Sequence, residues 1–220
     1  MLLRVEQIER KVVRDSVGLG LAVGSYGISF GAVAVAAGLS PLQACVLSLL
    51  AFTGGSQFAY VGVVGAGGAA ASAVTTALLL GVRNTLYAVR LAPLLQTRGA
   101  RRLVAAQLTI DETAAMAVAQ PVAEKRLGRL AFWATGAAVY LFWNAATLLG
   151  ALVGQAVDPV RLGLDGAVPA AFLALLWPRL RAAAGRRVAL VAVLLAAAGV
   201  LLLPAGLAVP VAALAVVVAR

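Results

Sequence analysis

Three stretches of this chain each run for more than 20 residues without a charged side chain. They cover residues 17–39, 42–64 and 130–157. A helix needs about 20 apolar residues to cross the hydrocarbon core of a bilayer. Hydrophobic residues make up 63% of the 220-residue chain and charged residues 12%, against about 25% charged in soluble domains. A soluble domain of this size cannot hide so much apolar surface. The sequence therefore predicts an integral membrane protein and excludes a soluble enzyme or a nucleic-acid-binding module.

Eight hydrophobic segments can be counted along the chain. Their runs are continuous rather than alternating with a period of two, which favours helices over a β-barrel. We predict an all-α, polytopic membrane helical bundle with seven or eight membrane helices, at least one of them broken or re-entrant. Residues 16–220 form a single transmembrane domain, and residues 1–15 form an amphipathic helix in the cytoplasm or at the membrane interface. The segments are residues 17–39, 42–64, 69–95, 103–122, 130–157, 162–177, 188–203 and 207–219.

The basic residues gather between these segments, at residues 4–14, 98–102, 125–129 and 179–187. Lys and Arg in short loops mark the cytoplasmic side of a membrane protein, and there they face anionic lipid headgroups. This explains the net charge of +10 without a nucleic-acid partner and predicts a cytoplasmic N-terminus. If all eight segments cross the membrane, the basic set at 98–102 lies on the outer side. If the second and fourth segments instead dip into the membrane and return, every basic set lies inside.

The chain has no histidine and one cysteine, Cys45. These counts exclude His-based triads, HExxH zinc sites, His-ligated haem and an internal disulfide, so we expect neither a metal nor another cofactor. A Ser-Lys or paired-carboxylate enzyme would still be open. However, Lys11 and Lys125 lie outside the predicted spans, and the side chains of Asp111 and Glu112 diverge on a helix. We therefore expect no enzymatic activity.

Four charged residues lie deep inside predicted spans, where each is costly and marks a function by default, whereas Asp165 lies near the end of the sixth segment. Arg83 and Arg90 lie in the third segment, and their spacing places them on one helical face with Tyr87. Asp111 and Glu112 lie in the fourth segment. One interpretation is a structural ion pair that joins two helices. The other is a site in which an arginine holds a substrate carboxylate and an acidic residue exchanges protons. The two interpretations can hold together.

Uncharged polar residues interrupt other segments. The second contains residues 53–57, which read Thr-Gly-Gly-Ser-Gln. A Gly-Gly pair permits unwinding, and half-helix ends near the membrane midplane bind small charged solutes in many transporters. Close helix packing on small residues is the alternative, and it is the favoured interpretation for the glycines of the first segment at residues 24–31. Asn84 flanks the arginine face, and Trp143 and Asn144 in the fifth segment indicate a cavity wall.

Several short motifs occur in a specific order over nearly the whole chain. They are Gly27-Ile28-Ser29-Phe30-Gly31, Phe52 to Phe58, Val82 to Tyr87, Leu91-Ala92-Pro93, Asp111-Glu112, Trp143-Asn144, and Leu162 to Asp165 with Pro169 and Phe172. Together they resemble the AzlC family, the large subunit of branched-chain amino acid exporters. Ser29 stands where the family usually has Pro, Gly81 where it has Asn, and Asn84 where it has His. Without that His, the expected proton-carrying residues are Asp111 and Glu112.

The resemblance implies a secondary transporter in the bacterial cytoplasmic membrane. It implies proton-coupled export of Leu, Ile, Val and also Met, and a small hydrophobic partner subunit of the AzlD type. A transporter of another small organic solute and a non-transporting assembly subunit are the alternatives, and the four charges in the spans argue against the second. The residues expected to bind the amino acid are Phe30, Gly54, Gly55, Ser56, Gln57, Arg83, Asn84, Tyr87, Trp143 and Asn144, with Phe58 beside them.

Overall fold

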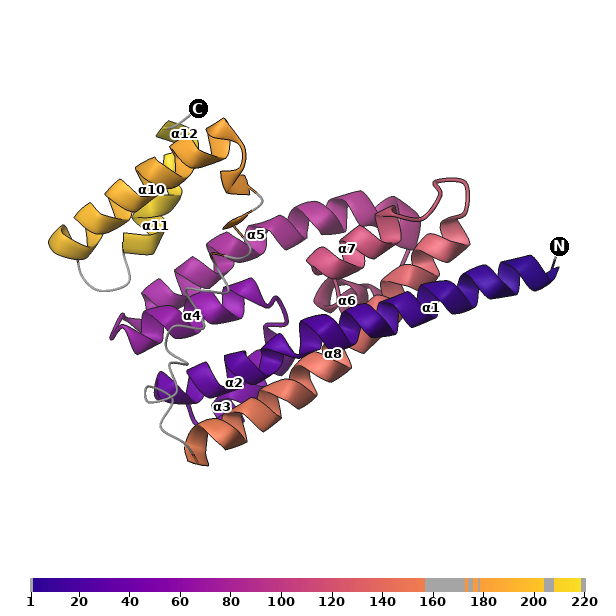
Figure 1. Ribbon diagram of the computed structural model, residues 1–220, viewed down its shortest axis with the longest axis horizontal. Coiled ribbons are helices and arrows are strands. Elements are labelled where there is room, and N and C mark those ends of the chain that lie inside the picture. The colour runs from indigo at the N-terminus through magenta and orange to yellow at the C-terminus, as the bar shows by residue number, and fades with distance from the viewer. Residues whose placement is uncertain (1, 157–172, 174–175, 178, 204–207, 219–220) are drawn as a thin grey trace.

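The computed structural model describes residues 2–156, 173, 176–177, 179–203 and 208–218. This part of the chain is helical and contains no strand (Figure 1), so the all-α prediction is confirmed. The predicted segment 162–177, with Asp165, lies almost wholly outside the described residues. The helices are α1 (Leu2–Gly24), α2 (Tyr26–Ala36), α3 (Pro41–Leu50), α4 (Gly55–Gly65), α5 (Ala70–Leu95), α6 (Ala100–Gln107), α7 (Asp111–Val118), α8 (Lys125–Ala156), α10 (Ala183–Leu202), α11 (Ala208–Ala213) and α12 (Ala215–Val218).

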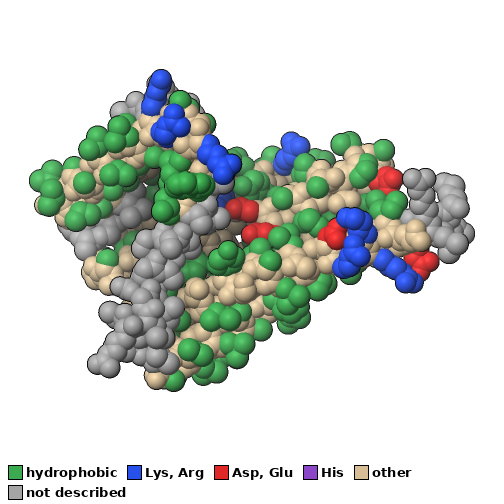
Figure 2. Space-filling model, viewed as in Figure 1, with side chains coloured by type: hydrophobic (Ala, Val, Ile, Leu, Met, Phe, Trp, Pro, Cys, Tyr) green, Lys and Arg blue, Asp and Glu red, His purple; other side chains and the backbone are tan. Residues whose placement is uncertain are grey.

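Four helical stretches of the described chain are long and apolar enough to cross a membrane. They are Glu6–Ala36, which joins α1 to α2, and the helices α5, α8 and α10. The amphipathic stretch 1–15 leads into the first of them, because α1 continues through residue 15 and the helix is interrupted only at Ser25. Figure 2 shows apolar side chains over much of the visible face, as expected of a surface that lipid covers. The number of full crossings stays a prediction.

Glycines let α1 and α2 pack closely along α8. A Cβ added at Gly24 would lie 2.5 Å from the Cβ atom of Phe142. One added at Gly31 would run into the carbonyl oxygen of Thr147, and one at Gly150 into that of Ile28. Backbones that approach this closely gain van der Waals contact, which drives helix association where no water is present. The small-residue interpretation of the first segment, a packing seam, is confirmed.

The second and fourth hydrophobic segments are each broken into two short helices. Residues 51–54 separate α3 from α4, and residues 108–110 separate α6 from α7. At the first break Gly54 adopts φ +60°, a conformation that favours glycine. At the second, the Thr113 hydroxyl accepts a hydrogen bond from the Ile110 N–H (3.0 Å). The prediction of at least one broken membrane helix is confirmed.

Each broken segment returns to the end of the molecule from which it enters (Figure 1). At the end of α4, a Cβ added to Gly65 would lie 3.1 Å from the Cβ atom of Ala37, just before α3 begins. At the end of α7, the carbonyl oxygen of Ala117 would lie 3.2 Å from a Cβ added at Gly128, which also faces Leu94 of α5. Each of the two segments thus forms a helical hairpin, the arrangement expected if both dip into the membrane and return. We call α3 with α4 the first hairpin and α6 with α7 the second hairpin.

Two ties between helices place three basic sets at the same end of the molecule. Arg126 of α8 forms an ion pair of 2.9 Å with Glu9 of α1. Arg129 donates from Nε to the carbonyl oxygen of Leu94 (2.7 Å), near the end of α5. The basic sets at 4–14, 98–102 and 125–129 therefore lie close together, as the positive-inside pattern requires of loops on one side.

The breaks of the two hairpins are joined directly. Gln107, at the end of α6, donates from Nε2 to the carbonyl oxygens of Leu49 (2.8 Å) and Leu50 (3.2 Å), at the end of α3. The Tyr140 hydroxyl of α8 also donates to the Leu49 oxygen (3.2 Å). The last carbonyls of a helix have no partner within it. These side chains supply partners and fix one break against the other.

We expect Gln107→Leu to lower the free energy of unfolding by about 1–2 kcal/mol, because it removes two interhelical hydrogen bonds and leaves the Leu50 carbonyl oxygen without its side-chain partner. Thermal unfolding in detergent would measure the change. Gln120→Leu is the matched control, since the Gln120 side chain, just after α7, donates only to the carbonyl oxygen of Met116 four residues earlier. Equal unfolding midpoints for the two variants would show that the hydrogen bonds between Gln107 and the end of α3 do not stabilise the fold.

Candidate functional site

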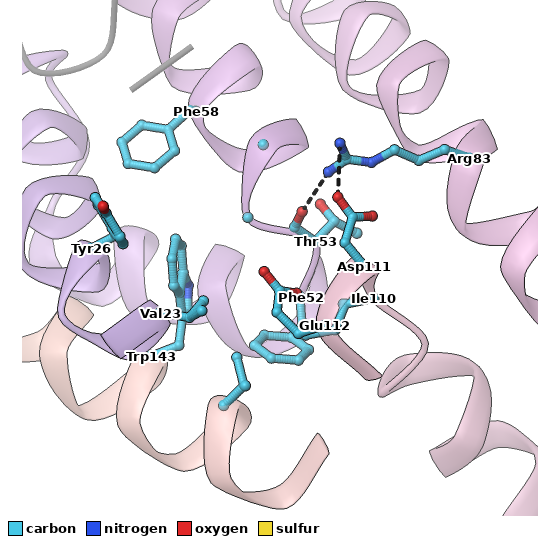
Figure 3. Close-up of a pocket in the computed structure, with 13 residues that line it drawn as sticks. Val23, Tyr26, Phe52, Thr53, Phe58, Arg83, Ile110, Asp111, Glu112 and Trp143 are labelled. Carbon is cyan, nitrogen blue, oxygen red and sulfur yellow. Dashed lines mark hydrogen bonds and ion pairs between the residues drawn. The ribbon is translucent and has the colours of Figure 1, made fainter. Parts of the chain in front are cut away.

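A cavity of about 350 Å³ lies where the two breaks meet α1, α2, α5 and α8 (Figure 3). We call it the central cavity. Both hairpins contribute the ends of half-helices to it, since Gly54 and Gly55 start α4, and Asp111 and Glu112 start α7. The N-terminus of a helix carries partial positive charge and unpaired N–H groups. The cavity is therefore suited to hold negative charge at two points.

Arg83 joins α5 to both breaks. Its Nη1 atom lies 3.2 Å from Oδ2 of Asp111, and its Nη2 atom donates to the carbonyl oxygen of Thr53 at 3.5 Å (Figure 3). The structural ion pair between the third and fourth segments is thus present. The two side chains remain 36% and 41% exposed, and both line the cavity. Arg83 is therefore both a structural tie and a cation that a ligand can reach.

Glu112 enters the same cavity from the first turn of α7, and Figure 3 shows its side chain projecting inward beside Asp111. The two neighbouring side chains diverge as expected, with Asp111 turned to Arg83. No ion pair joins Glu112 to a described residue. Arg90 is exposed on α5, lies outside the cavity lining and forms no ion pair with the described residues. The structure thus brings together three of the four charges in the spans.

One wall of the cavity is aromatic. The rings of Phe58 and Trp143 line it with their centroids 6.3 Å apart. Phe30, fully buried, lies behind them with centroid distances of 5.5 Å to Phe58 and 6.1 Å to Trp143. Aromatic pairs in this range are attractive and rigid. Phe30 therefore supports the wall without lining the cavity. The cavity is also lined by two further aromatic residues, Tyr26 and Phe52, and by three aliphatic ones, Val23, Ile110 and Val139.

The residues expected to bind substrate fall into three groups. Gly54, Gly55, Phe58, Arg83 and Trp143 line the central cavity together with Asp111 and Glu112. Ser56, Gln57 and Asn84 instead line a second hollow beyond the 51–54 connection. Phe30, Tyr87 and Asn144 line neither, and the Asn144 side chain donates to the carbonyl oxygen of Tyr140 (2.8 Å).

The Thr53 carbonyl oxygen and most of the apolar lining were not predicted from the sequence. Phe52 and Thr53 adjoin the Gly-Gly pair, so their position was a usable signal. Nothing in the pattern distinguishes Val23 or Val139 from the other aliphatic residues of their helices. No group of three or more His, Cys, Asp or Glu residues that could hold a metal occurs within the described ranges.

A family model described as AzlC protein matches residues 18–157, which is more than half of the chain. The chain belongs to the AzlC family. The matched region includes both hairpins and every residue that lines the central cavity. The AzlC family is a transporter family, known for branched-chain amino acid transport. No curated protein and no solved structure matches the chain.

Proposed function

We propose that this chain is the large subunit of a two-component exporter of Leu, Ile and Val, with Met as a further substrate. The observation that carries the proposal is the lining of the central cavity, which sets one guanidinium and two carboxylates against an aromatic and aliphatic wall. A zwitterion with an apolar side chain needs these three kinds of group. The volume of about 350 Å³ is within the roughly 300–1,000 Å³ of small-molecule sites.

The amino acid carboxylate binds Arg83 and the N–H groups at the start of α4. A guanidinium matches a carboxylate with two parallel hydrogen bonds, and a half-helix N-terminus adds favourable electrostatics. The ammonium group lies near Glu112, on the opposite break. The aliphatic side chain then contacts Phe58, Val139 and Trp143, where burial of apolar surface contributes roughly 25 cal/mol per Å².

Coupling to protons follows from competition for Arg83. The substrate carboxylate and Asp111 both need the same guanidinium, so binding of substrate weakens the ion pair. An ionised side chain within a membrane span is costly unless it is paired, so in the proposed cycle Asp111 accepts a proton when it loses its cation. Asp111 and Glu112 would carry that proton through the transport cycle.

The test is transport in liposomes by the purified chain together with the short hydrophobic protein of the AzlD type. We expect accumulation of Leu, Ile and Val, and also of Met, against Ala, Glu and Lys as comparison solutes. The accumulation should cease when a protonophore dissipates the proton gradient. Equal transport of all the amino acids would contradict the proposed substrate class and favour a transporter of another small solute. Full transport by the chain alone would contradict the need for a partner.

Replacing Glu112 with Gln should separate binding from coupling. The amide keeps the shape of the side chain but carries no proton through the cycle, so we expect exchange of labelled leucine to persist while gradient-driven accumulation falls at least about tenfold. Liposomes with and without a pH gradient measure both quantities. Glu124→Gln, on the exposed connection before α8, is the control. Unchanged accumulation by Glu112→Gln would remove this residue from the proton path.

The proposed location is the bacterial cytoplasmic membrane with the N-terminus inside. The grouping of three basic sets at one end supports this orientation.

A further inference from the structure

The second hollow, of about 600 Å³, lies between the ends of α3 and α6, the start of α4 and one face of α5. We call it the α5 groove. Phe52 and Thr53 line both this groove and the central cavity, so the 51–54 connection separates the two. None of the side chains that line the groove belongs to Asp, Glu, Lys or Arg. It therefore lacks the charges that would bind an amino acid zwitterion.

Small residues form the floor of the groove on α5. Ala77, Gly81 and Thr85 follow one another at four-residue spacing, and all three line it. Leu78 beside them is 66% exposed. Small residues at this spacing let a second helix approach the backbone closely in a membrane. In the described structure 6% of the membrane-spanning part of α5 is buried against the rest of the chain, whereas 44% of the membrane-spanning part of α8 is buried.

The chain's own packing does not require glycine at position 81. A Cβ added at Gly81 would meet only the Ser56 hydroxyl, at an ordinary distance of 3.7 Å. By contrast, Gly31 and Gly150 lie against backbone carbonyls of the neighbouring helix. The space above Gly81 is therefore open for a group from outside the described chain.

Two polar groups in the groove are buried without hydrogen-bond partners. Ser56 is 5% exposed, and neither its hydroxyl oxygen nor Oδ1 of Asn84 has a partner within the described chain. Lipid tails can neither donate nor accept, and an unpaired polar group in a membrane is costly. The partner that fits the groove is therefore an apolar helix with an uncharged side chain that can form hydrogen bonds.

We infer that the α5 groove is the docking site for a transmembrane helix of the small second subunit. The identity of that subunit rests on the proposed function. The position of the docking helix and the kind of side chains it presents are inferred from the residues of the groove. The docking helix presents a small residue to Gly81, and a Ser, Thr, Asn or Gln side chain to Ser56 and Asn84. Since α5 carries Arg83 on its adjacent face, the docked helix holds the arginine's helix against the hairpins.

Co-purification tests the docking site. The chain, carrying an affinity tag, is expressed together with the short hydrophobic protein of the AzlD type, and the ratio of the two proteins is measured after purification in mild detergent. We expect Gly81→Leu to reduce the co-purified second protein at least about tenfold, because the added side chain fills the groove. Gly62→Leu on α4, where an added Cβ meets nothing within 4 Å, should retain it. Wild-type amounts with Gly81→Leu would overturn the proposal.

A crosslinking experiment covers the case in which Gly81→Leu fails to fold. A photoreactive benzoylphenylalanine replaces Leu78 in the groove or, as a control, Val89, which is 69% exposed outside it. We expect an adduct with the second protein at position 78 and none at position 89. An adduct at position 78 with residues 157–172 of this chain, with a second copy or only with lipid would overturn the proposal. Transport that requires both proteins while position 78 gives no adduct would reject the docking site and leave the proposed function standing.

Discussion

Arg83→Ala should reduce amino acid transport by about two orders of magnitude or more. The substitution removes the cation that binds the substrate carboxylate, and it also leaves Asp111 in the cavity without its guanidinium. Hydrogen bonds to charged groups contribute about 1.5–3 kcal/mol each, a guanidinium makes two to a carboxylate, and each 1.4 kcal/mol is a factor of ten in affinity. Initial rates of leucine transport in liposomes, at matched protein levels, would measure the loss.

Two further variants make the Arg83 result specific. Arg90→Ala removes a charge from the same helix but outside the cavity, and it should transport at the wild-type rate. Arg83→Lys keeps the charge but loses the planar guanidinium, which can contact Thr53, Asp111 and the substrate carboxylate at once. Its transport rate should therefore lie between those of the wild type and Arg83→Ala. Wild-type transport by Arg83→Ala would show that the arginine is only a structural tie.

Gly150→Leu should prevent the chain from folding. Any Cβ at this position runs into the carbonyl oxygen of Ile28, and a backbone atom cannot turn aside as a side chain can. Overpacking within a core costs about 1–3 kcal/mol and sometimes more, and this substitution forces apart backbone contacts between α2 and α8. The expected result is little or no folded protein in the membrane fraction, measured by size-exclusion chromatography after detergent extraction.

Gly18→Leu is the control for the Gly150 variant. It makes the same substitution in α1, where an added Cβ has no atom within 4 Å. It should yield a monodisperse protein at the wild-type level. A folded Gly150→Leu chain with an unchanged unfolding midpoint would show that the seam between α2 and α8 can open without cost.

The sequence predicts most of what makes this fold a membrane protein with interrupted helices. Polar residues within apolar runs carry that information, because each must be satisfied by unwound backbone or by a partner on another helix. The break at Gly54 and the pairing of Arg83 with an acidic residue of the fourth segment follow from this argument. Direct contact between the two breaks does not follow, since Gln107 resembles any other polar residue in the sequence.

The division of the expected site residues between two hollows has a simple geometric cause. Successive residues on a helix point about 100° apart, so Arg83 and Asn84 face opposite sides of the 51–54 connection. The same holds for Gly55 and Ser56 at the start of α4. Proximity in sequence identified the right region, but only the positions of α4 and α5 relative to each other decide which side chain faces which hollow.

The two hairpins enter from opposite ends of the molecule and meet at their turns. The centre of the protein is consequently closed by a few residues of non-helical backbone, 51–54 from one side and 108–110 from the other, and not by crossing helices alone. In the transport cycle proposed above, each turn would act as the gate towards one surface of the membrane. A shift of one turn would open the cavity towards one surface, while α8 and the glycine seam stay fixed.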